Sequence, residues 1–313
     1  EMFAPLFPDA GYIPLKEHHA TIQQLVLEGK SVEAEALIHE IKREAGLTQR
    51  HFTDPFVGAA ALWLKMDGAA ESEGYARSVD FETGEALVAW RAGAELYHRQ
   101  FFVSRARDVV VVRLASPTGS KLSLSVGLGE IAYTPPEDPN KPDIYKEVVD
   151  QCEGSVAGTT LTQRMRFKDR WEDQKILGCC TVASVQTSGG SVEADGGVLR
   201  VAGAEELLVL IRTVPDRRGE TLVPADVAAA LGEIMADYGQ LLDEHAAIHR
   251  EIFGRCRLQL SSPEAQRVSG EELYKRSEVG ATDPAYVEKA FDGSRYALIG
   301  STGNLPPALQ GVW

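Results

Sequence analysis

The sequence predicts a mainly β protein in which an antiparallel β-sandwich is followed by a long helix. Short apolar runs separated by turn-forming residues fill the chain from about residue 61 to residue 211, which is typical of a sandwich. Beyond residue 227 the apolar residues recur at steps of three and four, the period of an amphipathic helix. Strands and helices do not alternate, so a Rossmann or TIM-type parallel sheet is not expected.

Two helices are expected ahead of the first strand. Apolar residues recur at helical spacing between residues 15 and 45, and Gly29 interrupts them. A turn at residues 29–31 between two helices accounts for this pattern. Gly46 stands where a helix commonly ends.

The strands of the sandwich are indicated by alternating or apolar runs bounded by Gly, Pro, Asn and Asp. Residues 82–85 and the pair Asp195-Gly196 have the composition of hairpin turns. A loop rich in proline and acidic residues is expected at 135–143. The expected strands are 61–66, 75–81, 86–90, 96–103, 109–114, 122–128, 160–167, 177–185, 192–195, 198–201 and 207–211.

The residues from Val227 to Phe253 are expected to form one continuous helix, part of a rod of roughly 30 residues and roughly 45 Å. Pro224 near its start is compatible with a first helical turn. The polar stretch 261–278 is expected to be a loop. Asp283-Pro284 then has the composition of a helix start, and that helix should continue to about Ile299.

Three domains are expected from this order of elements. Residues 1–222 form the sandwich with its N-terminal helical segment, residues 223–280 form a helical linker, and residues 281–313 begin a further domain.

Composition narrows the classes of partner. The formal net charge of −14 disfavours nucleic acid, whose phosphates would be repelled. No stretch approaches the ~20 apolar residues that span a bilayer, and the first residues do not resemble a signal peptide. The four cysteines match no zinc or redox motif; they are Cys152, Cys179, Cys180 and Cys256.

Candidate chemical residues mostly favour structural roles. His245 and His249 lie one helical turn apart, as zinc ligands can, but Ala246 replaces the glutamate of the H-E-x-x-H pattern and no third ligand is evident. A structural helix face is therefore expected. Trp63 and Trp90 could stack on sugar rings, although a place in the sandwich core is favoured. No pair of carboxylates suited to glycoside cleavage stands out.

The end of the chain carries its most specific pattern. The run from Ser294 to Trp313 resembles the barrel-entry motif of glycoside hydrolase family 95, which contains α-L-fucosidases and related α-L-galactosidases. Its most specific part is Leu305-Pro306-Pro307-Ala308-Leu309-Gln310-Gly311-Val312-Trp313. Residues 75–84 and 99–114 resemble two sandwich segments of that family, and residues 25–35 resemble its early helical segment.

This resemblance implies a fold and an activity. The family has an N-terminal β-sandwich (a supersandwich), a helical linker and an (α/α)6 barrel, of which this chain would hold a truncated first part. Its members hydrolyse terminal α-L-fucosyl or α-L-galactosyl residues of oligo- or polysaccharides with inversion. A Glu acts as general acid, and Asn residues of an Asn-x-Asn motif, with an Asp, activate the water. These residues lie downstream of the motif, so no catalytic residue is assigned within the chain.

The resemblance also suggests binding residues and a compartment. Asn304, Gln310 and Trp313 are expected to contact the sugar, with no metal, no cofactor and no nucleic-acid or membrane partner. The oligomeric state is left open, and an extracellular or periplasmic location is expected. The alternative from a different class is a non-catalytic carbohydrate-binding or scaffolding sandwich.

Overall fold

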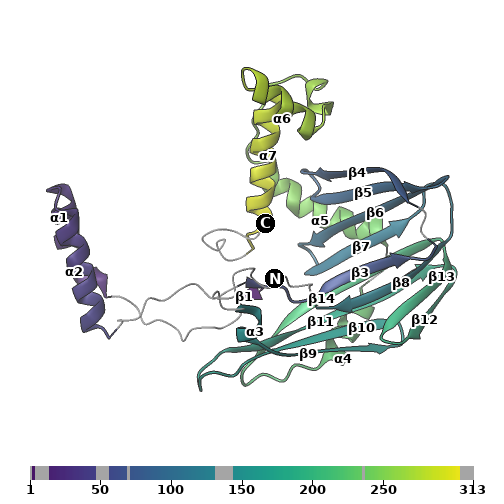
Figure 1. Cartoon of the computed structure of the whole chain (residues 1–313), viewed down its shortest axis with the longest axis horizontal. Helices are drawn as coiled ribbons and strands as arrows, with labels where there is room; N and C mark the ends of the chain where they lie inside the picture. The colour runs from purple at the N-terminus through teal and green to yellow at the C-terminus, as the bar shows by residue number, and fades with distance from the viewer. Residues whose placement is uncertain are drawn as a thin grey trace.

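The computed structural model describes residues 2–3, 14–46, 56–68, 71–130, 144–234 and 237–303 (Figure 1). Every strand pair in this part of the chain is antiparallel. The larger sheet has, in spatial order, β4 (Ser72–Asp80), β5 (Glu85–Ala92), β6 (Glu95–Ser104), β7 (Val109–Ala115), β14 (Glu206–Arg217), β11 (Ile176–Ser188), β10 (Thr160–Phe167) and β9 (Val149–Ala157).

A smaller sheet packs on one face of the larger one. Its order is β12 (Ser191–Asp195), β13 (Val198–Ala204), β8 (Leu122–Gly129) and β3 (Ala61–Met66), and a separate pair joins β1 (Met2–Phe3) to β2 (Phe56–Val57). The mainly β fold with two antiparallel sheets is thus confirmed. Among the described residues, no helix combines the length and apolar character needed to cross a membrane.

The core between the two sheets follows from strict alternation along the strands. On β13, Leu199 and Val201 are buried whereas Arg200 between them is exposed, because successive side chains of a strand point to opposite faces. Leu122, Leu124 and Val126 of β8 extend the same inner layer. The opposite face of the small sheet is therefore free to carry polar groups.

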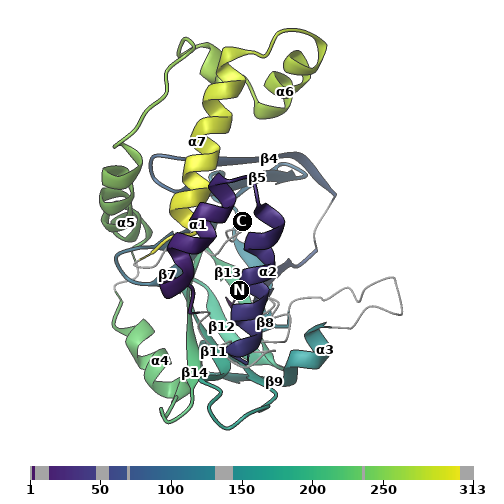
Figure 2. The ribbon, with the colours of Figure 1, turned by 90° about the vertical axis from the view of Figure 1, so that its left-hand side faces the viewer.

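Helices cover the other face of the larger sheet. Helix α4 (Pro224–Gly232) packs on β11 and β14, and α5 (Tyr238–Phe253) packs on β6 and β7. Their apolar side chains join one cluster with those of the strands; it includes Phe102, Val111, Leu210, Val227, Leu231, Tyr238 and Leu241. Figure 2 shows both helices on the same side of the larger sheet.

The prediction of one continuous helix from Val227 to Phe253 is wrong. Helix α4 ends at Gly232, a residue with poor helix propensity. Helix α5 then starts afresh after Asp237, whose carboxylate accepts a hydrogen bond from the backbone N–H of Gln240 at 2.7 Å. Two shorter helices can follow a twisted sheet, whereas one straight rod of this length would diverge from it.

The predicted loop at 261–278 is also wrong in part. It contains the short helix η2 (Ala265–Arg267) and the beginning of α6 (Gly270–Val279). The Ser269 hydroxyl caps α6 by accepting from the N–H of Glu272. Leu273 is a fully buried apolar residue in an otherwise polar helix, so the apolar spacing was too sparse to predict it.

The remaining helices agree with expectation except for one. The N-terminal pair is η1 (Leu15–His18) with α1 (His19–Leu27), followed by α2 (Ser31–Glu44), and α7 (Pro284–Gly300) begins after Asp283 as predicted. Helix α3 (Ile144–Val148) and the edge strand β9 were not predicted. Most residues of β9 are polar or exposed, so it lacks the apolar alternation of the inner strands.

Trp63 and Trp90 differ in whether they pack against the sandwich core. Trp90 is partly buried and stacks on Tyr97, with ring centroids 5.6 Å apart. Trp63, which was expected in the core, is 42% exposed, so that expectation is wrong.

Two adjacent glycines between β11 and β12 allow a stability prediction. Gly189 and Gly190 have φ of 66° and 68°, but a Cβ on Gly190 would lie 2.3 Å from the carbonyl oxygen of Ala202, whereas one on Gly189 would meet nothing closer than 3.7 Å. We expect Gly190→Ala to lower the free energy of unfolding by about 1–2 kcal/mol more than Gly189→Ala. Urea unfolding of the two variants measures the difference; equal midpoints would contradict the steric argument.

Candidate functional site

The junction between the sandwich and the C-terminal helices is the candidate functional site. It brings together the β4–β5 turn, the β6–β7 turn, one face of α5 and the C-terminal half of α7. The last described residue, Gly303, follows this junction directly. The predicted sugar-binding residues Asn304, Gln310 and Trp313 lie outside the described residues, so their assignment remains a prediction.

Arg105 of the β6–β7 turn holds the end of α7. Its guanidinium donates to the carbonyl oxygen of Ile299 and, at 3.3 Å, to that of Thr302. These carbonyls belong to the last turn of α7 and the residues after it, where the helix dipole favours a cation. The direction in which the chain leaves α7 is therefore fixed from the sandwich.

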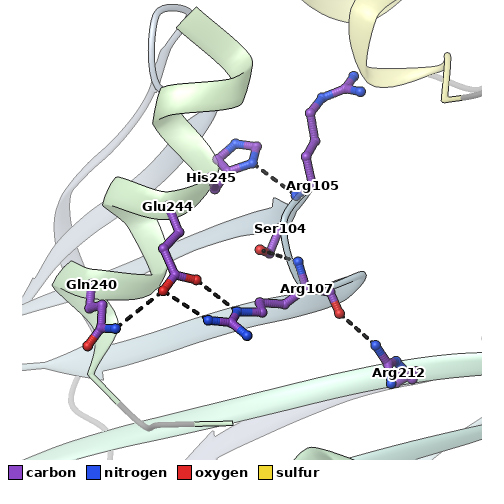
Figure 3. A network of polar contacts seen from close by, with 7 residues as sticks. All are labelled: Ser104, Arg105, Arg107, Arg212, Gln240, Glu244 and His245. Atoms are coloured by element: carbon purple, nitrogen blue, oxygen red, sulfur yellow. Dashed lines mark hydrogen bonds and ion pairs between the residues drawn. The ribbon is translucent and has the colours of Figure 1, made fainter.

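The backbone of the same turn is tied to α5. The N–H of Arg105 donates to Nδ1 of His245 at 3.2 Å. Two residues later, Arg107 forms a two-fold contact with Glu244, with Nε to Oε2 at 2.8 Å and Nη2 to Oε1 at 3.0 Å. Figure 3 shows Arg107 reaching from the turn across to Glu244 on α5, while Arg105 points away toward α7. One turn therefore contacts both helices.

A ladder of aromatic rings forms the buried face of α5. Phe102, His245, His249 and Phe253 follow one another with ring centroids 5.1, 5.5 and 6.0 Å apart. His249 Nε2 also lies 2.9 Å from the carbonyl oxygen of Phe81 in the β4–β5 turn, to which it can donate. The two histidines are 3% and 2% exposed, which agrees with the structural helix face expected for them.

Burial decides the charge state of these histidines. Desolvation lowers the pKa of His245 to about 4, and the neighbouring His249 and the Arg105 charge act in the same direction. The pKa of His249 is also lowered, chiefly by burial. Both rings are therefore neutral near pH 7.

Among the residues that the structure describes, no group of three or more His, Cys, Asp or Glu side chains could hold a metal ion. Gly84 instead lies close to the pair, since a Cβ there would be 2.9 Å from His245 Nε2. The β4–β5 turn thus fits directly against the rings.

Helix α7 contributes a second arginine to the junction. Arg295 donates to the carbonyl oxygen of Phe253 at 2.7 Å and also to that of Cys256, and its guanidinium lies 5.0 Å from the centroid of the Phe253 ring. The next residue, Tyr296, packs on Phe81 with ring centroids 5.5 Å apart. Each of the two helices therefore has its C-terminal carbonyls held by an arginine from a neighbouring element.

The start of α5 is anchored in the sandwich as well. The hydroxyl of Tyr238 donates to Glu85 Oε1 at 2.6 Å, and the same carboxylate accepts from Gln100 Nε2 at 2.8 Å. Burial, with the Glu85 carboxylate, raises the pKa of Tyr238. Helix α5 is thus fixed at both ends relative to the larger sheet.

Two acidic residues of α7 have contrasting environments. Glu288 accepts hydrogen bonds from the backbone N–H groups of Leu260 and Ser261 and from the Ser261 hydroxyl, and these donors lower its pKa. Burial raises the pKa of Asp292, and the nearby Glu288 charge adds to this. All three of these hydrogen bonds go to Oε2 of Glu288, so we assign the side chain to holding the segment before α6.

A surface hollow lies away from the junction, on α6 and α7. It has a volume of about 600 Å³ and is lined by Gly270, Glu271, Tyr274, Lys275, Glu278 and Tyr286. Its residues do not include those that link α7 to the sandwich, so the junction remains the better candidate for a functional role.

Sequence reasoning did not identify the two arginines of the junction. Arg105 shares a short turn with Arg107, and the partners of its side chain are carbonyls about 190 residues away, for which no local pattern exists. Arg295 belongs to the run 294–313 that resembles the barrel-entry motif, and that position was the available signal.

Comparison with known proteins divides the chain between the sandwich and helix α5. Residues 12–216 match the family profile "Glycosyl hydrolase family 65, N-terminal domain", which covers well over half of the chain. Residues 237–313 match "Glycosyl hydrolase family 95 catalytic domain". The second match begins at Asp237, the cap of α5, which is where the predicted rod is interrupted.

Two curated proteins are similar to this chain in sequence. The chain is 26% identical over 258 residues to alpha-L-fucosidase 2 of Arabidopsis thaliana, covering 76% of this chain and 30% of the relative. It is 24% identical over 271 residues to probable alpha-fucosidase A of Aspergillus niger, covering 83% and 33%. The chain therefore spans about a third of the length of the curated relatives that it matches.

A solved structure, a putative kojibiose phosphorylase from the human microbiome, aligns over 67% of this chain and 30% of that one, with a TM-score of 0.43 and 8% sequence identity. The resemblance to glycoside hydrolase family 95 is confirmed by the match to its catalytic domain. The chain belongs to the family of glycosyl hydrolase family 65 N-terminal domains, and it continues into a segment that matches the glycosyl hydrolase family 95 catalytic domain.

Proposed function

We propose that the chain is the N-terminal part of a glycoside hydrolase that removes terminal α-L-fucosyl residues from oligo- or polysaccharides with inversion. The observation that carries this proposal is the catalytic-domain match over residues 237–313, which begins at α5. The names of the two relatives support the choice of fucose. Within this proposal, the sandwich provides a rigid support and the junction sets the orientation of the catalytic domain.

We propose that the residues that cleave the glycosidic bond lie beyond residue 313. An inverting enzyme needs a general acid and a group that activates water on opposite sides of the scissile bond. Oε2 of Glu288 accepts from the backbone N–H groups of Leu260 and Ser261, and from the resemblance we expect the general acid and the Asn-x-Asn motif after Trp313. We therefore propose that Asn304, Gln310 and Trp313 contact the sugar, and that downstream residues cleave it.

The test compares the chain with the protein extended through its catalytic domain. We expect the extended protein to release fucose from 2′-fucosyllactose and from an aryl α-L-fucoside, and the chain of residues 1–313 to release none. Proton NMR in the first minutes of the reaction should show β-L-fucose as the initial product, since inversion converts the α-anomer.

Parallel assays decide between the substrates. Turnover of an aryl α-L-galactoside at a higher kcat/KM than the fucoside would replace fucose by galactose in the proposal. Turnover by the chain alone would show that the catalytic groups had been placed wrongly. Initial release of α-L-fucose would exclude inversion.

We also propose that the protein acts outside the cytosol, in an extracellular or periplasmic space. The support is the resemblance to a family whose substrates include polysaccharides. Polysaccharides do not enter cells, so an enzyme that acts on them must meet them outside the cytosol. Fractionation of the source cells with an antibody against the sandwich would test this location.

A further inference from the structure

The outer face of the small sheet carries an unusual tryptophan. Trp63 on the edge strand β3 lies opposite Gly127 of β8. A Cβ on Gly127 would lie 2.0 Å from Cζ2 and 2.1 Å from Cε2 of Trp63. The six-membered part of the indole therefore rests on the glycine backbone. Because Gly127 is buried and Trp63 is 42% exposed, the ring covers the strand and still presents a large area to solvent.

Polar side chains lie on the same face, one row of side chains along the sheet from this ring. Arg200 of β13 donates through Nη1 to Ser125 Oγ at 2.9 Å and to Asp67 Oδ1 at 3.0 Å, and its Nε lies 3.4 Å from Asp195 Oδ2. Ser125 is opposite both Arg200 and Lys65 in the sheet register, one row of side chains away from Trp63 and Gly127. The guanidinium is thus held in place on the same face as the ring, two strands away from β3, with its charge balanced.

Covering a glycine does not by itself explain a tryptophan here. An aromatic ring placed over a strand glycine stabilises a sheet, but a smaller apolar side chain could shield Gly127 without leaving so much indole in water. Large exposed aromatic surface costs free energy of hydration unless a ligand covers it. A flat ring that shares its sheet face with fixed donors and acceptors is suited to an oligosaccharide. The apolar face of one pyranose can stack on the indole while hydroxyl groups of a neighbouring sugar reach the polar side chains.

We propose that this surface, which we call the Trp63 face and define by Trp63, Lys65, Asp67, Ser125, Asp195 and Arg200, binds a neutral oligosaccharide. One sugar ring stacks on the indole, and hydroxyl groups of the next reach Arg200 and its carboxylate partners. The ligand is neutral because the charges of Arg200 are already compensated and the chain as a whole carries −14. The face lies on the sandwich, outside the catalytic segment of residues 237–313.

The inference takes from the proposed function only the class of ligand, and the two can fail separately. Binding is measured with the chain of residues 1–313, for which no turnover is expected. An enzyme without a Trp63 site would leave the proposed function standing. A Trp63 site on a protein without fucosidase activity would leave this inference standing.

The experiment is affinity electrophoresis of the chain in gels containing soluble xyloglucan, galactomannan or mixed-linkage glucan, with polygalacturonate as an anionic control. We expect retardation by at least one neutral polymer and not by polygalacturonate. Trp63→Ala should weaken the retardation about tenfold or more, equivalent to about 1.4 kcal/mol. Gly127→Ala should do the same by displacing the ring. Tyr75→Ala is the matched control, because Tyr75 is an aromatic residue 61% exposed on the edge strand β4.

A second measurement covers the case in which the Trp63 variants do not fold. With 5-fluorotryptophan incorporated in the unaltered sequence, addition of the retarding polymer's oligosaccharide should shift the ¹⁹F resonance of Trp63 and leave that of Trp90 in place. The Trp63 resonance is assigned by elimination, as the one that persists in Trp90→Phe, Trp171→Phe and Trp313→Phe. The proposal is overturned if no neutral polymer retards the chain, if only polygalacturonate does, or if the Trp63 resonance stays unshifted while the chain binds.

Discussion

Replacing Arg105 by methionine in the protein extended through its catalytic domain is expected to lower kcat/KM for the fucoside by about 100-fold. The guanidinium of Arg105 holds the carbonyls of Ile299 and Thr302, immediately ahead of the segment with the predicted sugar-binding residues. Loss of these bonds frees the end of α7, and a misplacement of about 1 Å in a substrate-positioning segment can cost about 10²-fold in rate. Arg105 is thus a positioning residue.

The matched control is Arg107→Met in the same turn. Arg107 pairs with Glu244 at the surface and is about half exposed, and such pairs contribute ~0–1 kcal/mol. We expect this variant to keep kcat/KM within about threefold. At both positions methionine keeps an unbranched side chain but lacks the guanidinium, so the comparison isolates the contact of Arg105 with α7.

A readout other than activity separates positioning from general destabilisation. Amide hydrogen exchange should speed up at residues 297–303 in Arg105→Met and remain as in the unaltered protein across β6 and β7. The effect on kinetics should appear in both kcat and KM, because the segment would contact substrate throughout the reaction. Unchanged exchange at the end of α7, or equal losses in the two arginine variants, would refute the role given to Arg105.

The sandwich could be predicted from the sequence because its physical signal is local. Leu199, Arg200 and Val201 alternate between core and solvent, and that alternation is written in consecutive residues. The Asp283-Pro284 start of α7 is equally local. The prediction of one rod failed because two weak local signals, Gly232 and the Asp237 cap, divided an otherwise regular apolar pattern.

The junction could be predicted only in fragments. The spacing of His245 and His249 showed that they share a helix face, but not that the face would meet Phe102 and the carbonyl of Phe81. The pairing of Arg105 with the end of α7 joins positions about 190 residues apart, so nothing near either position in the sequence reports it. The exposed Trp63 was misplaced for a related reason, since its burial depends on Gly127 of a neighbouring strand.

The histidines of the junction also make its stability depend on pH. In an unfolded chain His245 takes up a proton near pH 6.5, whereas in the folded protein it resists protonation until about pH 4. Between these values the unfolded state binds more protons, so the free energy of unfolding falls as the pH falls from about 6.5 to about 4. A pKa difference of this size corresponds to a loss on the order of 3 kcal/mol, and the lowered pKa of His249 adds to it.

The groups that face these rings explain the direction of the effect. Burial against Phe102 and Phe253 is the main cause, and the positive charge of Arg105 from the β6–β7 turn opposes protonation further. Asp80 of β4 acts in the opposite direction on His249, but its carboxylate is already bonded to the backbone N–H groups of Glu82 and Thr83. Protonation therefore places a second positive charge beside Arg105 without a free carboxylate to balance it.

The test compares the pH dependence of unfolding in matched variants. His245→Phe keeps a ring stacked on Phe102 but cannot take up a proton; it loses the acceptor of the Arg105 N–H, which should cost about 1 kcal/mol at pH 7. Between pH 6.5 and pH 4, urea unfolding of this variant should show a fall about 3 kcal/mol smaller than that of the unaltered protein. His39→Gln, on the exposed side of α2, should leave the fall unchanged. Because carboxylates also titrate near pH 4 in all three proteins, the contribution of His245 is obtained from the difference between the curves. If the free energy of unfolding falls equally in His245→Phe and in the unaltered protein, protonation of His245 does not cause the pH dependence and the prediction is wrong.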